Sequence, residues 1–171
     1  MLKKATGIII RYVYFFAGLW VMSCGIYLTI MAKRLGVSPW DVFHLGLLNY
    51  LPVSFGLISQ LVGGIIVVLA MALGIRPRLG TLLNMYLVGI FINVLINKRI
   101  VSEAEGWPIA LAYLALGLIF WGIGTSMYIT ANLGAGPRDS LMIGLHKKTG
   151  YRIAAVRTIT EVVAVITGLI L

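Results

Sequence analysis

The chain has few charged residues, few acids and one cysteine. Charged residues make up 11% of its 171 residues, whereas a soluble domain carries roughly 25%. Two of its five acids, Glu103 and Glu105, lie in an expected loop, so the polar groups that an enzyme site concentrates are missing. The sequence also contains no His-Glu-x-x-His, Gly-x-Ser-x-Gly or phosphate-loop motif. No enzymatic activity is therefore expected.

Metal and cofactor chemistry has little support in the sequence. Cys24 lies inside an apolar run and, as the one cysteine, can form neither an intrachain disulfide nor a cysteine-based metal site. His44 and His146 do not occupy matching positions in the repeat described below, so a two-histidine metal site is not expected either. We predict no metal and no cofactor.

Apolar residues dominate instead, at 60% of the chain, with a mean hydropathy of +1.01. A soluble protein of this length could not bury so much apolar surface, so an integral membrane protein in a lipid bilayer is expected. The apolar runs are continuous rather than alternating, which favours helices over barrel strands. Long apolar runs predict five spans at residues 12–32, 55–75, 79–96, 107–131 and 153–171. The first is expected to be an uncleaved span and not a signal peptide.

The net charge of +9 comes from basic residues between or beside these runs. Such residues set topology and contact anionic headgroups, so nucleic acid is not expected as a partner. With the N-terminus inside, nine basic residues face the cytoplasm and four face outward, which predicts a cytoplasmic N-terminus. The inner set is Lys3, Lys4, Arg11, Arg76, Arg78, Arg138, Lys147, Lys148 and Arg152, and the outer set is Lys33, Arg34, Lys98 and Arg99.

Two segments between spans, residues 38–51 and 136–148, are too short to cross a membrane as regular helices. Each begins like a helix. Ser38 is a good N-cap, Pro39 suits the first helical position and Asp41 completes a capping-box pattern. The second segment repeats this pattern with glycine as the cap.

An internal repeat relates the two segments. Leu, Gly, Pro and Asp recur at an interval of 98 residues, and upstream matches in the spans follow at 99. Residues 1–99 thus form a first unit with three spans, and residues 100–171 a second with two. Because three is odd, the second unit is inverted in the membrane, and a sixth span is expected after residue 171. The key matched positions are Gly36 with Gly134, Pro39 with Pro137, and Asp41 with Asp139.

Inverted repeats broken by glycine and proline are typical of secondary transporters. Architecture alone does not establish transport. Glycines inside the spans, such as Gly18 and Gly117, are packing positions or hinges.

Three motifs carry a resemblance to a known family. They are Gly-Val-Ser-Pro-Trp-Asp at 36–41, Gly-Thr-Leu-Leu-Asn at 80–84 and Gly-Ala-Gly-Pro-Arg-Asp at 134–139. With them, residues 12–161 resemble the YczE/YyaS/YitT family of bacterial membrane proteins, and the YczE branch in particular. The resemblance implies a multi-pass bacterial plasma-membrane protein whose relatives have been grouped with small-molecule exporters. It implies no known reaction and no established site residues.

The candidate binding residues are polar groups within or beside the spans. Asp41 and Asp139 could hold a proton, a cation or a cationic substrate, or could only cap their helices. Arg157 and Glu161 share a helix face and form either a functional site or a structural ion pair. Gln60 and Asn84 could line a polar cavity or bond between helices. We predict that these residues meet in one central region: Asp41, Asp139, Arg157 and Glu161, with Gln60 and Asn84 beside them.

The leading functional hypothesis is a secondary transporter or exporter of a small molecule or ion, working by alternating access between the two units. The alternative is a non-transporting scaffold or regulatory interaction protein. A homo-oligomer is compatible with either. A polar cavity between the units favours transport, whereas a packed centre favours a scaffold.

Overall fold

The computed structural model describes residues 2–32 and 35–171, and the side chains from residue 7 onward within that range. Four basic residues in the charge asymmetry, Lys3, Lys4, Lys33 and Arg34, therefore have side chains outside the described part. The described chain is entirely helical, with no strand. Its seven helices are α1 (Leu2–Met31), α2 (Pro39–Leu48), α3 (Phe55–Ala72), α4 (Leu79–Lys98), α5 (Trp107–Thr130), α6 (Pro137–Thr149) and α7 (Ile153–Ile170).

Five of these helices, α1, α3, α4, α5 and α7, are long and apolar enough to cross a membrane. They confirm the five predicted spans, and α3, α4, α5 and α7 begin at the predicted residues. Helix α1 begins about three turns earlier than expected, because its charged first turns continue the helix ahead of the apolar run. Helices α2 and α6 are the two predicted short segments.

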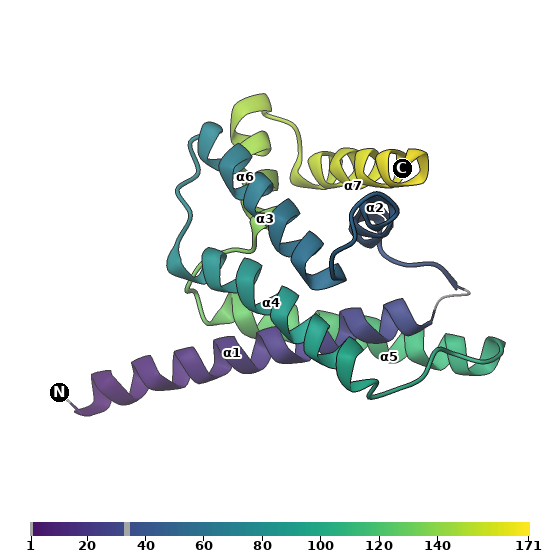
Figure 1. Cartoon of the computed structure of the whole chain (residues 1–171). Coiled ribbons are helices and arrows are strands. Elements are labelled where there is room, and N and C mark those ends of the chain that lie inside the picture. The colour runs from purple at the N-terminus through teal and green to yellow at the C-terminus, as the bar shows by residue number, and fades with distance from the viewer. Residues whose placement is uncertain (1, 33–34) are drawn as a thin grey trace.

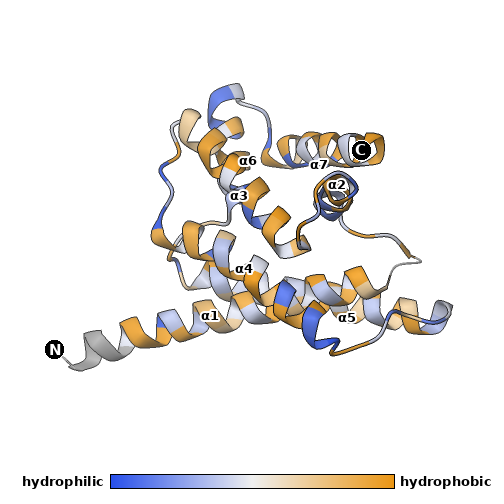
Figure 2. Cartoon of the chain, in the orientation of Figure 1, coloured by the Kyte–Doolittle hydropathy of each residue, from blue (hydrophilic) through white to orange (hydrophobic). Residues whose placement is uncertain are grey.

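The helices form two groups in Figure 1. Helices α1, α4 and α5 lie together in the lower part of the view, and α2, α3, α6 and α7 lie above them. Helix α1 projects past its neighbours at its N-terminal end. Figure 2 shows that hydrophilic residues gather mainly at the connections and helix ends, as expected for helices surrounded by lipid.

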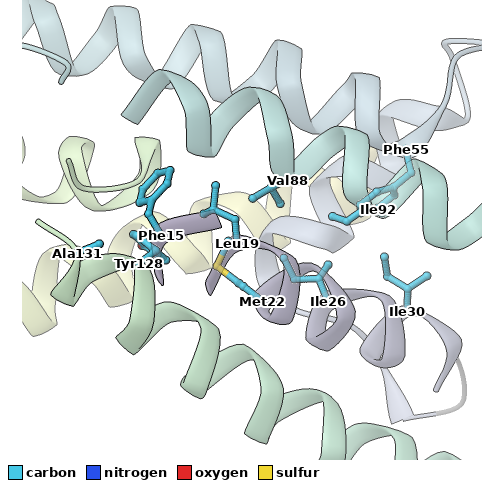
Figure 3. Packing of buried hydrophobic residues seen from close by; sticks show 10 residues of the cluster. All are labelled: Phe15, Leu19, Met22, Ile26, Ile30, Phe55, Val88, Ile92, Tyr128 and Ala131. Carbon is cyan, nitrogen blue, oxygen red and sulfur yellow. The ribbon is translucent and has the colours of Figure 1, made fainter. Parts of the chain in front are cut away.

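The largest apolar cluster joins α1 to the helices around it. Phe15, Leu19 and Met22 lie along α1 and are buried against residues of α4 and α5, including Val88 and Tyr128. Figure 3 shows these side chains converging between the helices. This cluster fixes α1 at the centre of the lower group.

Glycines bring α1 and α5 into backbone contact in antiparallel orientation. A Cβ placed on Gly18 would lie 2.9 Å from the Gly124 carbonyl oxygen, and one on Gly117 would lie 2.9 Å from the Gly25 carbonyl oxygen. There is no room for a side chain at these positions, so the helices meet through their backbones. The structure therefore gives these glycines a packing role.

Each short helix packs against a span of the other unit, α2 against α7 and α6 against α3. A Cβ on Gly46 of α2 would lie 3.0 Å from Leu171 Cβ at the end of α7, and one on Gly144 of α6 would lie 2.9 Å from Leu73 Cβ at the end of α3. Gly144 follows Gly46 by 98 residues, and Leu171 follows Leu73 by 98. These matched contacts are those that an inverted repeat requires, and the inverted repeat itself stays a prediction.

Candidate functional site: a central polar cavity

A cavity of about 690 Å³ lies between the two groups of helices and is lined by residues from all seven of them. This volume falls in the range of small-molecule sites. Its apolar wall includes Met22, Val88 and Ile92, which also belong to the main core cluster shown in Figure 3. Its polar wall comes mainly from the first turns of α2 and α6.

The first turn of α2 presents Asp41 to the cavity. The Ser38 hydroxyl accepts a hydrogen bond from the Asp41 backbone N–H and donates one of 2.6 Å to Asp41 Oδ2. The predicted N-cap is thereby confirmed, although the recorded carboxylate bond goes to the Ser38 hydroxyl rather than to its backbone. Asp41 is only 2% exposed, so its side chain needs hydrogen-bond partners within the protein.

His44 follows Asp41 by one helical turn and is 1% exposed. Its Nδ1 lies 3.7 Å from Asp41 Oδ1, which is too far for a hydrogen bond. Burial lowers the pKa of His44, and attraction to Asp41 offsets this lowering only in part. The imidazole is therefore neutral near neutral pH and adds no charge to the cavity.

The first turn of α6 mirrors that of α2. Asp139 Oδ2 accepts a 2.7 Å hydrogen bond from the Tyr128 hydroxyl of α5. Gly136, the N-cap, lets this pair approach the backbone closely, since a Cβ there would lie 3.3 Å from Asp139 Oδ2 and 3.5 Å from Asn84 Oδ1. Helices α4, α5 and α6 thus meet at the start of α6.

Arg138 and Trp40 connect the two first turns directly. The guanidinium carbon of Arg138 lies 5.0 Å from the centre of the Trp40 ring, within the range of a cation–π contact. No carboxylate of the described residues forms a salt bridge with Arg138 within 4.0 Å. Burial lowers the pKa of Arg138, and the nearby carboxylates of Asp41 and Asp139 oppose this shift. An arginine remains charged under such opposing effects.

Arg157 and Glu161 of α7 also line the cavity. Arg157 Nε donates a 2.9 Å bond to Glu161 Oε1 across one helical turn. The side chain of Arg157 is 70% exposed and that of Glu161 34%. The pair therefore lies at the edge of the cavity and neutralises itself.

Of the six predicted site residues, five line this one cavity: Asp41, Asp139, Arg157, Glu161 and Asn84. Gln60 does not line it. Its side-chain amide donates a 2.7 Å bond to the Tyr86 carbonyl, between α3 and α4. Gln60 therefore has the alternative role considered from the sequence, an interhelical hydrogen bond.

Buried polar atoms that have no hydrogen-bond partner within the described structure belong to only three residues. They are both ring nitrogens of His44, Nδ2 of Asn84 and Oγ1 of Thr125. All three residues line the cavity. A buried polar atom without a partner costs about 1–3 kcal/mol, so these atoms indicate a place where water or a polar ligand binds.

Sequence reasoning missed Trp40, Arg138 and Tyr128 as site residues. The charge asymmetry includes Arg138 among the inner basic residues, and the structure shows that Arg138 lines the central cavity beside Trp40. One indication was available. Trp40 and Arg138 occupy the same position of the repeat, directly before its aspartate.

Comparison with known proteins gives relatives but no activity. The chain is 37% identical to the uncharacterized membrane protein YczE of Bacillus subtilis over 88% of its own length and 69% of the relative. It is 30% identical to an uncharacterized protein of Haemophilus influenzae over 83% of its own length and 64% of the relative. It is 25% identical to the uncharacterized protein YyaS of Bacillus subtilis over 94% of its own length and 80% of the relative.

No solved structure matches the chain. The model of a family of unknown function, DUF6198, matches residues 9–171. Together with the YczE and YyaS relatives, this match confirms the resemblance seen in the sequence motifs. The chain is a multi-pass helical membrane protein and belongs to the DUF6198 family.

Proposed function

We propose that this protein is a secondary transporter of a small molecule, and that the central cavity is its binding site. The observation that supports this is the set of unpartnered buried polar atoms on His44, Asn84 and Thr125, all lining one cavity. A scaffold gains nothing from such atoms, because each destabilises the folded protein unless something binds to it. A transporter needs them to recognise its cargo.

The arrangement of the helices supports the same proposal. Two short helices begin at the cavity, and their first turns approach each other through Trp40 and Arg138. In many transporters, broken helices of two repeats end at a midplane site, and the repeats rock around it. By analogy, the unit of residues 1–99 and that of residues 100–171 move against each other and expose the cavity to each side in turn. The proposal assigns the chain to the bacterial plasma membrane, with no enzymatic step and no cofactor.

Alternating access can be tested with two matched serine-to-cysteine variants in a Cys24→Ser background. Ser59 of α3 lines the cavity, whereas Ser23 of α1 is fully buried in the core. We expect a small membrane-impermeant methanethiosulfonate reagent to modify Ser59→Cys from either side of the membrane, in right-side-out and in inverted vesicles. Ser23→Cys should react from neither side. Modification of Ser59→Cys from one side only, or from neither, would contradict alternating access.

A further inference from the structure

The charges around Trp40 leave one negative charge without a counterpart. Asp41 comes from α2, and Asp139 and Arg138 come from α6. His44 is neutral, and Arg157 neutralises Glu161. The cavity residues of α1, α3 and α4 include no acid or base, and the neutral hydroxyl of Tyr128 on α5 donates a hydrogen bond to Asp139. Two carboxylates therefore share one guanidinium, with Asp41 buried and Asp139 and Arg138 partly buried.

Each carboxylate has one oxygen held by a hydroxyl of the protein. Ser38 donates to Asp41 Oδ2, and Tyr128 donates to Asp139 Oδ2. The Oδ1 atom of each acid has no hydrogen bond of its own among these contacts, and the Oδ1 of Asp41 lies 3.7 Å from His44 Nδ1. Two acceptor oxygens thus remain available for a ligand that donates hydrogen bonds. An uncompensated negative charge in a partly buried site strongly favours a positively charged occupant.

The site already contains one bound cation, the side chain of Arg138. Its planar guanidinium lies over the face of the Trp40 ring. A cation held there is attracted to the negative face of the ring. The buried amide of Asn84 and the ring nitrogens of His44 have no partner and lie on the same cavity. They can bond to the uncharged polar part of a ligand that fills the remaining volume.

We propose that the cavity binds a monovalent organic cation with an amidinium, guanidinium or ammonium group, between Asp41 and Asp139. This inference rests on the proposed function and names its substrate class. The bound cation supplies the positive charge that Arg138 alone does not provide for the two carboxylates.

The test uses two probes of the same shape and opposite charge, benzamidinium and benzoate. Their binding to the purified full chain in lipid nanodiscs is measured by calorimetry. We expect benzamidinium to bind and benzoate not to bind. Asp41→Asn and Asp139→Asn should each weaken benzamidinium binding on the order of 10-fold or more. Glu105→Gln, which removes an exposed acid outside the cavity, should leave the affinity for benzamidinium unchanged.

The effect of Arg138→Gln on binding distinguishes a cation site from an anion site. If Arg138 competes with the ligand for the two carboxylates, its removal leaves a second negative charge and strengthens benzamidinium binding severalfold. A gain in affinity cannot result from misfolding. If benzoate binds instead and Arg138→Gln abolishes that binding, the cation assignment is wrong, and Arg138 is an anion receptor. Binding of neither probe also overturns the assignment. The two-sided reactivity of Ser59→Cys is independent of these outcomes, so the failure of this inference is distinguishable from the failure of the transport proposal.

Discussion

The guanidinium carbon of Arg138 lies 5.0 Å from the centre of the Trp40 ring, and the two residues hold the same position in the two copies of the sequence repeat. This contact joins α2 to α6 at the cavity, although the two helices are almost one hundred residues apart in the sequence. It is the most direct link between the two units at the proposed binding site.

The first prediction concerns the strength of this contact. In a double-mutant cycle with Trp40→Leu and Arg138→Gln, we expect a coupling energy of about 0.5–2 kcal/mol in unfolding experiments in detergent. The cycle with Trp107→Leu in place of Trp40→Leu is the control, because Trp107 is largely exposed at the start of α5. A coupling as small as in the control cycle would show that the stacking contributes no stability.

The second prediction concerns the crossing of α1 and α5. A Cβ on Gly25 would lie 2.5 Å from the backbone nitrogen of Trp121 and 2.6 Å from the Gly117 carbonyl oxygen. Gly25→Ala should therefore force the two helices apart and destabilise the protein by about 1–3 kcal/mol, as other overpacked sites do. The matched control is Gly7→Ala on the same helix, where a Cβ would meet nothing within 4 Å. Equal melting temperatures for the two variants would contradict backbone contact at this crossing.

The third prediction concerns pH. Burial lowers the pKa of His44 below its ordinary value of 6.5, so the unfolded chain binds a proton more readily than the folded chain. Stability should therefore fall as the pH drops below about 6.5, and the loss should level off below the pKa of the folded state. We expect His44→Asn to remove part of this slope in melting temperatures measured between about pH 7.5 and pH 5. A slope retained in full by His44→Asn would reject this role.

The features that could be predicted from the sequence are those set by neighbouring residues. The lengths of the apolar runs predicted the five spans. Local capping predicted the start of α2, because Ser38, Pro39 and Asp41 act within a single turn. These features depend on neighbours in the sequence, so the sequence alone was enough. Helix α1 begins before the predicted span because a helix can start ahead of the apolar run that crosses the membrane.

Which side chains face the cavity depends on how the helices are rotated and how they cross. Neighbouring residues in the sequence do not determine either. Gln60 and Asn84 are both amides inside spans, yet Asn84 faces the cavity and Gln60 faces the α3–α4 contact. Arg138 was assigned to the membrane surface because its charge suggested headgroups, but the position of α6 places it beside Trp40. Only the tertiary arrangement distinguishes these alternatives.

The last prediction concerns orientation and tests the inverted repeat itself. Leaving Arg138 out of the nine inner basic residues gives eight against four, so the asymmetry still favours a cytoplasmic N-terminus. Ser54 and Thr149 are exposed at connections of the first and second unit. If the units are inverted, the two positions lie on opposite sides of the membrane. The paired contacts of Gly46 with Leu171 and of Gly144 with Leu73 agree with this arrangement.

The measurement is labelling of single cysteines with an impermeant maleimide in a Cys24→Ser background, in intact cells and in inverted vesicles. We expect Ser54→Cys to react in intact cells and Thr149→Cys to react only in inverted vesicles. Ser102→Cys, in the connection from α4 to α5, is the internal control and should behave like Ser54→Cys, because two spans separate the two positions. If Ser54→Cys and Thr149→Cys react from the same side, the units are not inverted. The first turns of α2 and α6 could then not approach the cavity from opposite sides, and the rocking mechanism would lose its structural basis. If the two react from opposite sides but with the sides exchanged, the repeat stands and the basic residues do not set the orientation.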